Sequence, residues 1–484
     1  MHCAQLAVSI AALVAAPALA ADGPALTLYR SDSPALYAGS GSAAEDGYAL
    51  VHERRTLQLA GGVQTLALAG LPTTLDPEAV DLDAGAGVRV LMQRLLLPRG
   101  EGNALLARQV GRTVSVLGTD GKPLAEGELL DAGDSLSVRT TDGRVMVLRD
   151  YAAVALTGAD AGARGATLAL TVDSARKGAA DAVLTYPAGG LGWRAAYTAT
   201  LQDGAACRIA FDARASIANR SGRDYRGAAL KLVAGEPNFA KSSGPRPVLM
   251  KAMAAPAAEA DAYTPQQAAL GDYRSYTLPQ RVDLPDASVS QVPLYAARTL
   301  DCQRAWIFDP APGAWSPPVP QLQPMMGPTH VEGQVASTLR FTAFDSLPAG
   351  YLRVLAVDRD GHAELLGEAR IADTPKSRPV DAVLGTAFDL RGARERTAFH
   401  VDRAARRMDE AFRITLSNAG DAARTVTVRE RPSRWRAWTL ASSSLKPSRQ
   451  TPDLLEFAVP VPAHGSATLD YALRYTWTAG QETE

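Results

Sequence analysis

The sequence has few cysteines, almost no net charge and, after its first twenty residues, no long apolar run. Three cysteines occur in 484 residues, and none belongs to a CxxC pair of the kind that binds zinc or performs redox chemistry. The formal net charge is -1, so long-range electrostatics does not attract the chain to nucleic acid, and we expect no nucleic-acid partner. No segment after residue 20 is long and apolar enough to predict a transmembrane helix.

The first twenty residues, "MHCAQLAVSIAALVAAPALA", form an apolar run that ends in Ala18-Leu19-Ala20. This small-x-small pattern predicts a signal peptide at 1–20 that is cleaved before Ala21, and hence export to the periplasm or cell envelope. The segment before the apolar run carries no Lys or Arg, which is unusual for a signal peptide. An uncleaved anchor is the alternative.

Export places Cys207 and Cys302 in an oxidising compartment, where they are candidates for one disulfide. The two cysteines are 95 positions apart in the sequence. In the chain-entropy account, a disulfide that closes a loop of this length stabilises a fold by roughly 4 to 5 kcal/mol. The alternative is two separately buried thiols, and the sequence leaves both open.

Apolar residues alternate with polar ones along most of the chain, and no segment shows a sustained helical period. In "CRIAFDARASIAN", for example, Cys207, Ile209 and Phe211 share one face. Turn signals at Gly61-Gly62 and Asp360-Gly361 predict hairpins. The predicted fold class is therefore all-β, with several antiparallel β-sandwich or small-barrel domains joined by irregular linkers.

The strand pattern stops in an Ala-, Pro- and Ser-rich segment, and this break defines the predicted domain organisation. The predicted parts are a signal peptide (1–20), an N-terminal β domain (21–160), the first part of a central β-sandwich (161–238), a flexible low-complexity linker (239–272), the continuing central β region (273–390) and a C-terminal β-sandwich (391–484).

No motif points to catalysis or to metal binding. The histidines after residue 20 are not spaced as zinc ligands, and HExxH, calcium-loop, phosphate-loop and nucleophile-elbow patterns are absent from the sequence. These histidines are His52, His330, His362, His400 and His464. We predict no catalytic residue, no metal ligand and no cofactor, although a site gathered from separate loops leaves no such motif.

The segment 391–436 contains twelve Arg and six Asp or Glu, a local excess of six positive charges. Two interpretations fit this pattern. The arginines form cross-strand ion pairs on a solvated face, or they form a patch for an envelope protein or an anionic polymer, whose phosphate or carboxylate groups suit the guanidinium fork.

Three glycines precede a Trp in "GGLGWRAAYTATL". We expect the glycines to bend the chain into a central strand and Trp193 to be buried, because aromatic residues in sheets mostly pack in cores. The alternative is that Trp193, Tyr197 and Tyr225 stack on a sugar ring.

Several blocks of the sequence, including "LGWRAAYTATL", "IANRSGRDYRGAALKLVAGEPN" and "LPAGYLRVLAVDRDGHAELLGEARI", resemble the bacterial domain-of-unknown-function family DUF4139 over about residues 180–478. The stretch "LAGGVQTLALAGLPTTLDPEAVDL" is similar to the preceding domain of mucoidy-inhibitor-like proteins, but strands replace their coiled coil. The resemblance implies a β-rich, often exported protein without assigned catalytic residues. The motif positions are interpreted as fold markers, namely Trp193, Tyr197, Asn219, Gly222, Tyr225, Gly235 and Gly367.

Together these features predict an exported, non-catalytic β-rich protein that acts by binding, as an envelope adaptor or structural component. Two alternatives remain at this level. One is a hydrolase of an envelope polymer, and the other is a carbohydrate-binding protein.

Overall fold

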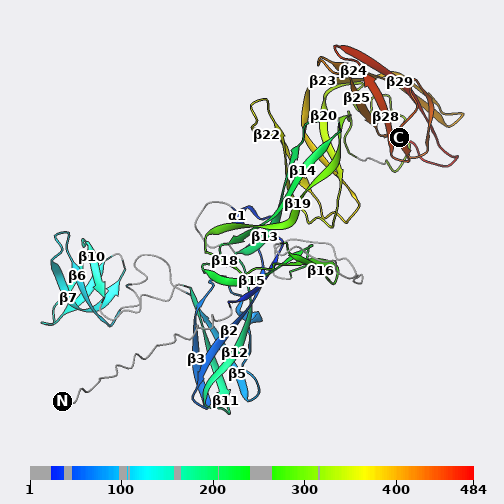
Figure 1. Ribbon diagram of the computed structural model, residues 1–484. Coiled ribbons are helices and arrows are strands. Elements are labelled where there is room, and N and C mark those ends of the chain that lie inside the picture. Colours follow the sequence, from blue (N-terminus) through cyan, green and yellow to red (C-terminus); the bar gives the residue numbers. More distant parts are fainter. Residues whose placement is uncertain are drawn as a thin grey trace, which may run out of the picture. The chain divides into compact units, whose positions relative to one another are not determined.

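A computed structural model describes residues 23–37, 46–97, 106, 110–133, 135–156, 165–204, 206–239, 264–313 and 317–484 (Figure 1). The fold is all-β, as predicted, and its strands form several separate sheets. The predicted signal peptide and most of the predicted linker fall outside the described residues. Within the described part, no helix has the length and apolar character needed to span a bilayer.

The chain divides into two compact units, each assembled from segments that are distant in the sequence. Unit 1 contains Met1–Trp193, Ile217–Val233 and Ser275–Ser290, and unit 2 contains Arg194–Ser216, Ala234–Arg274 and Gln291–Glu484.

Unit 1 holds three sheets. The first includes the run β15-β1-β2-β12-β4, with β18 beside β15, the second is β3-β11-β5, and the third is β10-β6-β7-β8-β9. The strands of the first sheet are β15 (Tyr225–Ala234), β1 (Ala25–Tyr29), β2 (Ala49–Leu59), β12 (Gly178–Ala188), β4 (Asp81–Asp83) and β18 (Val282–Leu284). Those of the second are β3 (Gly62–Leu71), β11 (Ala166–Ser174) and β5 (Val88–Leu96). Those of the third are β6 (Thr113–Leu117), β7 (Pro123–Ala132), β8 (Leu136–Thr140), β9 (Val145–Leu148) and β10 (Ala153–Leu156).

The third sheet has a small core of its own, centred on Val116, Leu129 and Val138. Its strands follow one another by short turns, such as the one at Asp142-Gly143 between β8 and β9. Alternating side chains supply the core, as the period-two pattern predicts.

The predicted hairpin at Gly61-Gly62 is wrong in one respect. The chain does turn there, with both glycines at positive φ (84° and 68°), but β2 pairs with β1 and β12 whereas β3 pairs with β11. The turn therefore carries the chain from one sheet to another. Alternation shows which face of a strand is buried, but it does not show which strand lies beside it. At Asp360-Gly361 the predicted hairpin is confirmed, because β21 (Gly350–Val357) pairs antiparallel with β22 (Ala363–Ile371).

Trp193 is fully buried in unit 1, as predicted. It lies in β13 (Leu191–Leu201), which the chain enters through Gly190 at φ 73°. The indole Nε1 donates a hydrogen bond of 3.0 Å to the carbonyl of Val233, and the ring meets Tyr276 edge to face at a centroid distance of 6.0 Å. The glycines thus provide the bend and the Trp anchors the strand.

Unit 2 is built on a long sheet that follows the order β22-β21-β13-β14-β19-β20-β23-β24-β29-β26. Three further strands join it through β25, which pairs with β19 and β28. The strands not yet given are β14 (Arg208–Asn219), β19 (Ser288–Phe308), β20 (His330–Thr342), β23 (Pro379–Asp402), β24 (Arg407–Asn418), β25 (Arg424–Glu430), β26 (Trp438–Ser443), β27 (Arg449–Thr451), β28 (Leu454–Val461) and β29 (Gly465–Thr476).

Two contacts tie the first strands of this sheet together. Cys207 and Cys302 form a disulfide with a Cα separation of 5.0 Å, which links the start of β14 to β19. Tyr197 is buried and its hydroxyl donates a hydrogen bond of 2.7 Å to the carbonyl of Pro348. The disulfide closes a loop with a sequence separation of 95 residues, so the chain-entropy account gives it about 4 to 5 kcal/mol of stabilisation.

A buried Asn ends β14 in unit 1, and another ends β24 in unit 2. The side-chain Nδ2 of Asn219 donates to the carbonyls of Arg223 (2.7 Å) and Leu284 (2.9 Å). The corresponding nitrogen of Asn418 donates to the carbonyls of Ala422 (2.9 Å) and Pro462 (3.0 Å). In both cases the first acceptor lies four residues ahead, and the side-chain oxygen accepts the backbone N–H two residues ahead.

Two of the glycine fold markers have a clear steric reason. A Cβ on Gly367 would collide with the backbone carbonyl of Leu384. Gly235 adopts φ 115° and packs against the ring of Tyr273. Both positions therefore need glycine.

We expect Trp193→Ala to destabilise unit 1 by about 3 to 5 kcal/mol, because the substitution removes a fully buried ring and its hydrogen bond. Denaturant unfolding measures this loss. Phe388→Ala is the matched control: Phe388 is 90% exposed, and its removal should change stability by less than about 0.5 kcal/mol. A W193A protein of unchanged stability would contradict the anchoring role.

We expect Asn219→Asp and Asn418→Asp each to destabilise its own unit by about 3 kcal/mol or more. The carboxylate has no donor for the two carbonyls and places a buried charge against them. Hydrogen exchange resolved by mass spectrometry should show faster opening of unit 1 in N219D and of unit 2 in N418D. Asn238→Asp, at an exposed position, is the control, and equal behaviour of all three variants would contradict the expectation.

Candidate functional site

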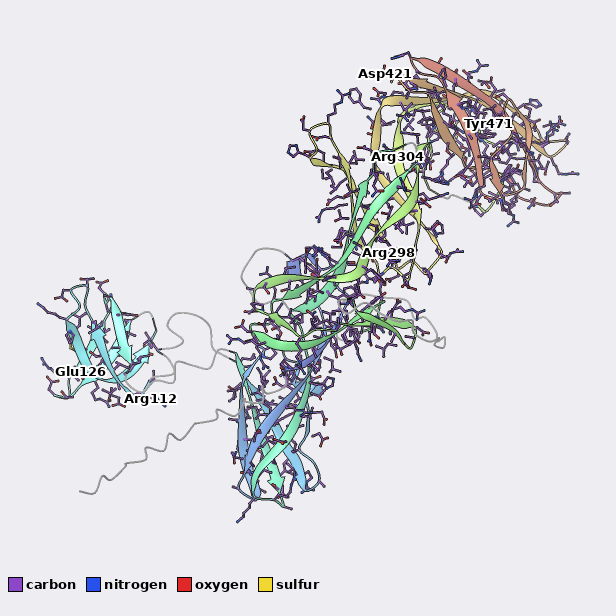
Figure 2. The ribbon with its side chains drawn as sticks, viewed as in Figure 1. Arg112, Glu126, Arg298, Arg304, Asp421 and Tyr471 are labelled. Carbon is purple, nitrogen blue, oxygen red and sulfur yellow. A yellow bond between two sulfur atoms is a disulfide. The ribbon has the colours of Figure 1, made fainter. Side chains whose placement is uncertain are left out.

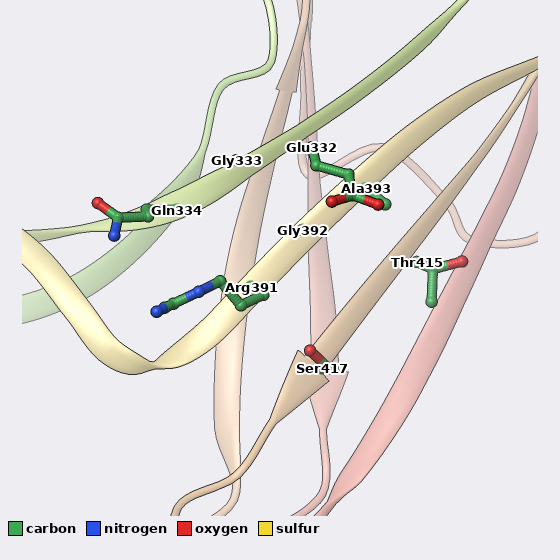
Figure 3. A pocket seen from close by; sticks show the side chains of 8 residues that line it. All are labelled: Glu332, Gly333, Gln334, Arg391, Gly392, Ala393, Thr415 and Ser417. Carbon is green, nitrogen blue, oxygen red and sulfur yellow. The ribbon is translucent and has the colours of Figure 1, made fainter.

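A solvent-open hollow of about 430 Å³ lies on the outer face of β20, β23 and β24 in unit 2. Figure 3 shows its lining from close by, with side chains projecting from three neighbouring strands. The lining consists of Glu332, Gly333, Gln334, Arg391, Gly392, Ala393, Thr415 and Ser417. It thus combines an acid, a guanidinium, an amide and two hydroxyls.

The strand register brings these side chains together. Gln334 lies opposite Arg391, which lies opposite Ser417 in the next strand. A second row, two residues away along each strand, contains Glu332, Ala393 and Thr415. Because side chains alternate between faces, the residues between the two rows point inward. Each row continues onto β29, where Ser466 lies opposite Ser417 and Thr468 lies opposite Thr415.

Phe308 lies beneath the floor of the hollow. Its ring packs in the core of unit 2, and a Cβ added to Gly392 would lie 2.5 Å from it. Gly333, paired with Gly392, also faces this ring. Because neither glycine carries a side chain, the core ring can approach the backbone of both strands closely at the floor of the hollow.

Arg391 lines the hollow at the point where β23 bulges away from β20, between Thr386 and Arg391, and Phe388 belongs to this bulge. The Nη1 of Arg391 donates to the carbonyls of Phe388 and Leu390, each at 2.9 Å. These bonds hold the guanidinium against the bulge, and no carboxylate of the described residues pairs with it. Phe388 is 90% exposed, which is unusual for an aromatic ring in a sheet.

Glu332 is the only carboxylate that lines the hollow, and its side chain is 77% exposed. Its Oε1 lies 3.2 Å from Nε2 of His330 on the same strand. A general acid needs a pKa raised by burial or by a second carboxylate. This lining therefore suits hydrogen bonding to a ligand better than proton transfer. Among the described residues, no group of three His, Cys, Asp or Glu side chains is placed to hold a metal ion.

The arginine-rich segment 391–436 is largely neutralised by its neighbours. Seven of its arginines pair with carboxylates, and three of the partner acids lie outside the segment, namely Asp309, Glu456 and Asp470. This arrangement matches the interpretation of cross-strand ion pairs. It also reduces the charge available for an anionic polymer to a few positions.

Three of these ion pairs are buried in unit 2, namely Arg394–Glu430, Arg396–Glu410 and Arg434–Glu410. Arg394 Nε bonds both oxygens of Glu430, at 3.0 and 3.1 Å, with the guanidinium 3.7 Å from the ring centroid of Phe412. Arg434 Nε bonds Glu410 at 2.8 Å. Burial raises the pKa of the Glu430 carboxyl, whereas the adjacent Arg394 charge opposes that rise. Tyr471, labelled in Figure 2, stacks on Phe412 in the same core.

Arg434 also holds the proline-rich segment that precedes β20. Its Nη1 donates to the carbonyls of Gln321 (3.1 Å) and Gln323 (2.7 Å), and Arg396 donates to the carbonyl of Pro324 at 2.6 Å. Glu484 pairs with the same segment, since its backbone N–H donates to the carbonyl of Pro320. Arg434 and Arg396 therefore stabilise the fold of unit 2.

The aromatic residues predicted from sequence do not form a sugar platform. Trp193, Tyr197 and Tyr225 are 0%, 1% and 1% exposed, and burial raises the pKa of the Tyr225 hydroxyl to about 12. The packing interpretation is confirmed for all three. Of the five histidines considered in the sequence analysis, only His330 contacts a residue that lines the hollow, namely Glu332.

The sequence analysis missed the hollow and Phe388. Glu332, Gln334, Thr415 and Ser417 occupy ordinary outward positions of strands, and only the register between strands brings them together. By alternation Phe388 has the same parity as the buried Leu384 and Leu390, so its sequence pattern is typical of a core residue.

Comparison with known families identifies a family model that matches most of the chain. The model of a domain of unknown function, DUF4139, matches residues 182–479, which is more than half of the chain and includes the whole hollow. No curated protein matches the chain.

We expect Glu430→Gln to destabilise unit 2 by about 3 to 5 kcal/mol, because the buried guanidinium of Arg394 would lose its counter-charge. The exposed pair Arg413–Asp470, with side chains 53% and 51% exposed, supplies the control: Asp470→Asn should cost less than about 1 kcal/mol. Denaturant unfolding of both variants tests the difference. Equal losses would show that burial does not set the importance of these pairs.

Proposed function

Because the chain belongs to the DUF4139 family, whose function is unknown, we propose its role from the hollow: the protein is an exported, non-catalytic binding protein of the cell envelope. The hollow is the surface that contacts its partner. The observation that carries this proposal is the polar lining of the hollow, together with Phe388, which is 90% exposed in the adjoining bulge three residues before Arg391. Aromatic rings and arginines are enriched in the centres of protein interfaces, where polar groups around them fix the orientation.

The chemistry of the lining favours an adaptor role with a protein partner. Arg391 offers N–H donors, Glu332 offers acceptors, and Gln334 offers both. A partner that covers the hollow would exchange hydrogen bonds with these groups and remove the Phe388 ring from water. Burial of one aromatic ring contributes roughly 1.5 to 3 kcal/mol.

Two features support export. The apolar segment at 1–20 ends in a cleavage pattern, and the Cys207–Cys302 disulfide suits an oxidising compartment. Sequencing the N-terminus of the protein recovered from the envelope fraction tests this part. A chain that begins at Ala21 would support it, and an intact chain in the cytoplasm would overturn it.

The two other candidate functions find less support in the hollow. An envelope-polymer hydrolase would need a second catalytic group, and the lining offers Glu332 as its single acid. A carbohydrate-binding protein would need exposed rings on which a sugar can stack, and the residues that line the hollow include no aromatic side chain.

A photo-crosslinker at position 415 tests the binding surface. We expect Thr415→benzoylphenylalanine to capture a specific envelope protein in intact cells. The same substitution at Val147, which is 61% exposed in the third sheet of unit 1, is the control and should not capture it. Adding Phe388→Ala should reduce capture about 10-fold or more without changing stability.

Each other outcome has a definite meaning. Capture of glycan without protein would support the carbohydrate-binding alternative. Equal capture from positions 415 and 147, or capture that is indifferent to Phe388→Ala, would overturn the proposed surface.

A further inference from the structure

Two arginines and a tryptophan form a cluster at the junction of β19 and β25 in unit 2. The guanidinium carbon of Arg424 lies 4.5 Å from the ring centroid of Trp306, and that of Arg304 lies 5.8 Å from it. None of the three residues lines the hollow. The position of Arg304 in the unit is labelled in Figure 2.

The register explains why the two charges meet. Trp306 lies opposite Val426 in the parallel pair of β19 and β25. Arg304 and Arg424 each precede that pair by two residues, so they lie on the same face and at the same level. Like charges in directly opposite positions destabilise a sheet.

Neither guanidinium has a carboxylate partner among the described residues. The Arg304 side chain makes a weak hydrogen bond, with 3.4 Å between its Nη2 and the hydroxyl oxygen of Ser337. The pKa of Arg304 is lowered, first by partial burial and then by the charge of Arg424. In this respect the pair differs from most arginines of segment 391–436, which have acid partners.

From this geometry we infer an oxyanion-binding site formed by Arg304 and Arg424, with the Trp306 ring as its platform and the Ser337 hydroxyl as a further donor. Both arginines are exposed, so a phosphate or carboxylate group can reach them. Two guanidinium forks beside the same ring offer N–H donors that suit the charge and the hydrogen-bond geometry of such a group. The bound anion also removes the repulsion between the two cations.

The ligand class is therefore a phosphate-type oxyanion, free or carried on an envelope polymer. The inference does not depend on the proposed function, because it concerns other residues. It also differs from the earlier interpretation of an arginine-rich patch, since Arg424 acts with an arginine of another strand, 120 positions earlier in the sequence.

Inorganic phosphate is the first probe, with chloride at equal ionic strength as the reference. We expect phosphate to raise the melting temperature by about 2 to 4 °C, as binding to the folded state does, and to change tryptophan fluorescence saturably. Trp306→Phe should abolish the fluorescence change. The double variant Arg304→Gln, Arg424→Gln should bind at least tenfold more weakly and should melt no lower than the parent protein in chloride.

Arg298→Gln is the matched control. Arg298 lies 3.7 Å from the ring centroid of Phe344, so it shares the cation–π contact but has no second arginine on that ring. R298Q should retain the response to phosphate.

Two results would overturn the inference of an oxyanion site. Equal responses to phosphate and chloride would show general screening of charge, and an undiminished response in the R304Q, R424Q protein would place any bound phosphate elsewhere. If inorganic phosphate binds, a phosphate-bearing polymer should bind more tightly through several groups. Equal affinity per phosphate would assign the site to the free ion.

Discussion

A turn between buried strands must leave no backbone carbonyl unpaired, and in this protein a buried Asn meets this requirement twice, after β14 and after β24. Asn219 and Asn418 are each the last residue of a strand. The side-chain nitrogen of each donates one hydrogen bond to the carbonyl four residues ahead and a second to a carbonyl that is distant in the sequence. The next strand begins six residues later in both cases, at Tyr225 and at Arg424. The Asn therefore fixes the turn into β15 in one case and into β25 in the other.

The similarity extends to the strands around each Asn. After Asn219, β15 runs parallel to β1 and antiparallel to β18. After Asn418, β25 runs parallel to β19 and antiparallel to β28. The short sequence likeness between "SIANRSGRDY" and "TLSNAGDAA" therefore corresponds to one arrangement of strands used in both units. A carboxamide suits this position because one small group supplies two donors and one acceptor.

The sequence predicted features that depend on near neighbours and missed those that depend on partner strands. Alternation predicted the strands and the burial of Trp193, since both follow from a few adjacent residues. It failed at Gly61-Gly62, where the turn was correct but the partner of β2 was not β3. The excess charge of segment 391–436 left two interpretations open, and the structure favours ion pairs, because Asp309 and Asp470 neutralise its arginines from other parts of the chain.

The same dependence on register explains why both candidate binding surfaces are invisible in the sequence. The hollow gathers ordinary polar residues from three strands, and the cluster around Trp306 joins two arginines from strands far apart in the chain. The parallel pair of β19 and β25 is also the link by which β25, β28 and β27 join the long sheet. An anion that relieves the repulsion between Arg304 and Arg424 stabilises this link, so ligand binding and the stability of unit 2 are coupled by mass action.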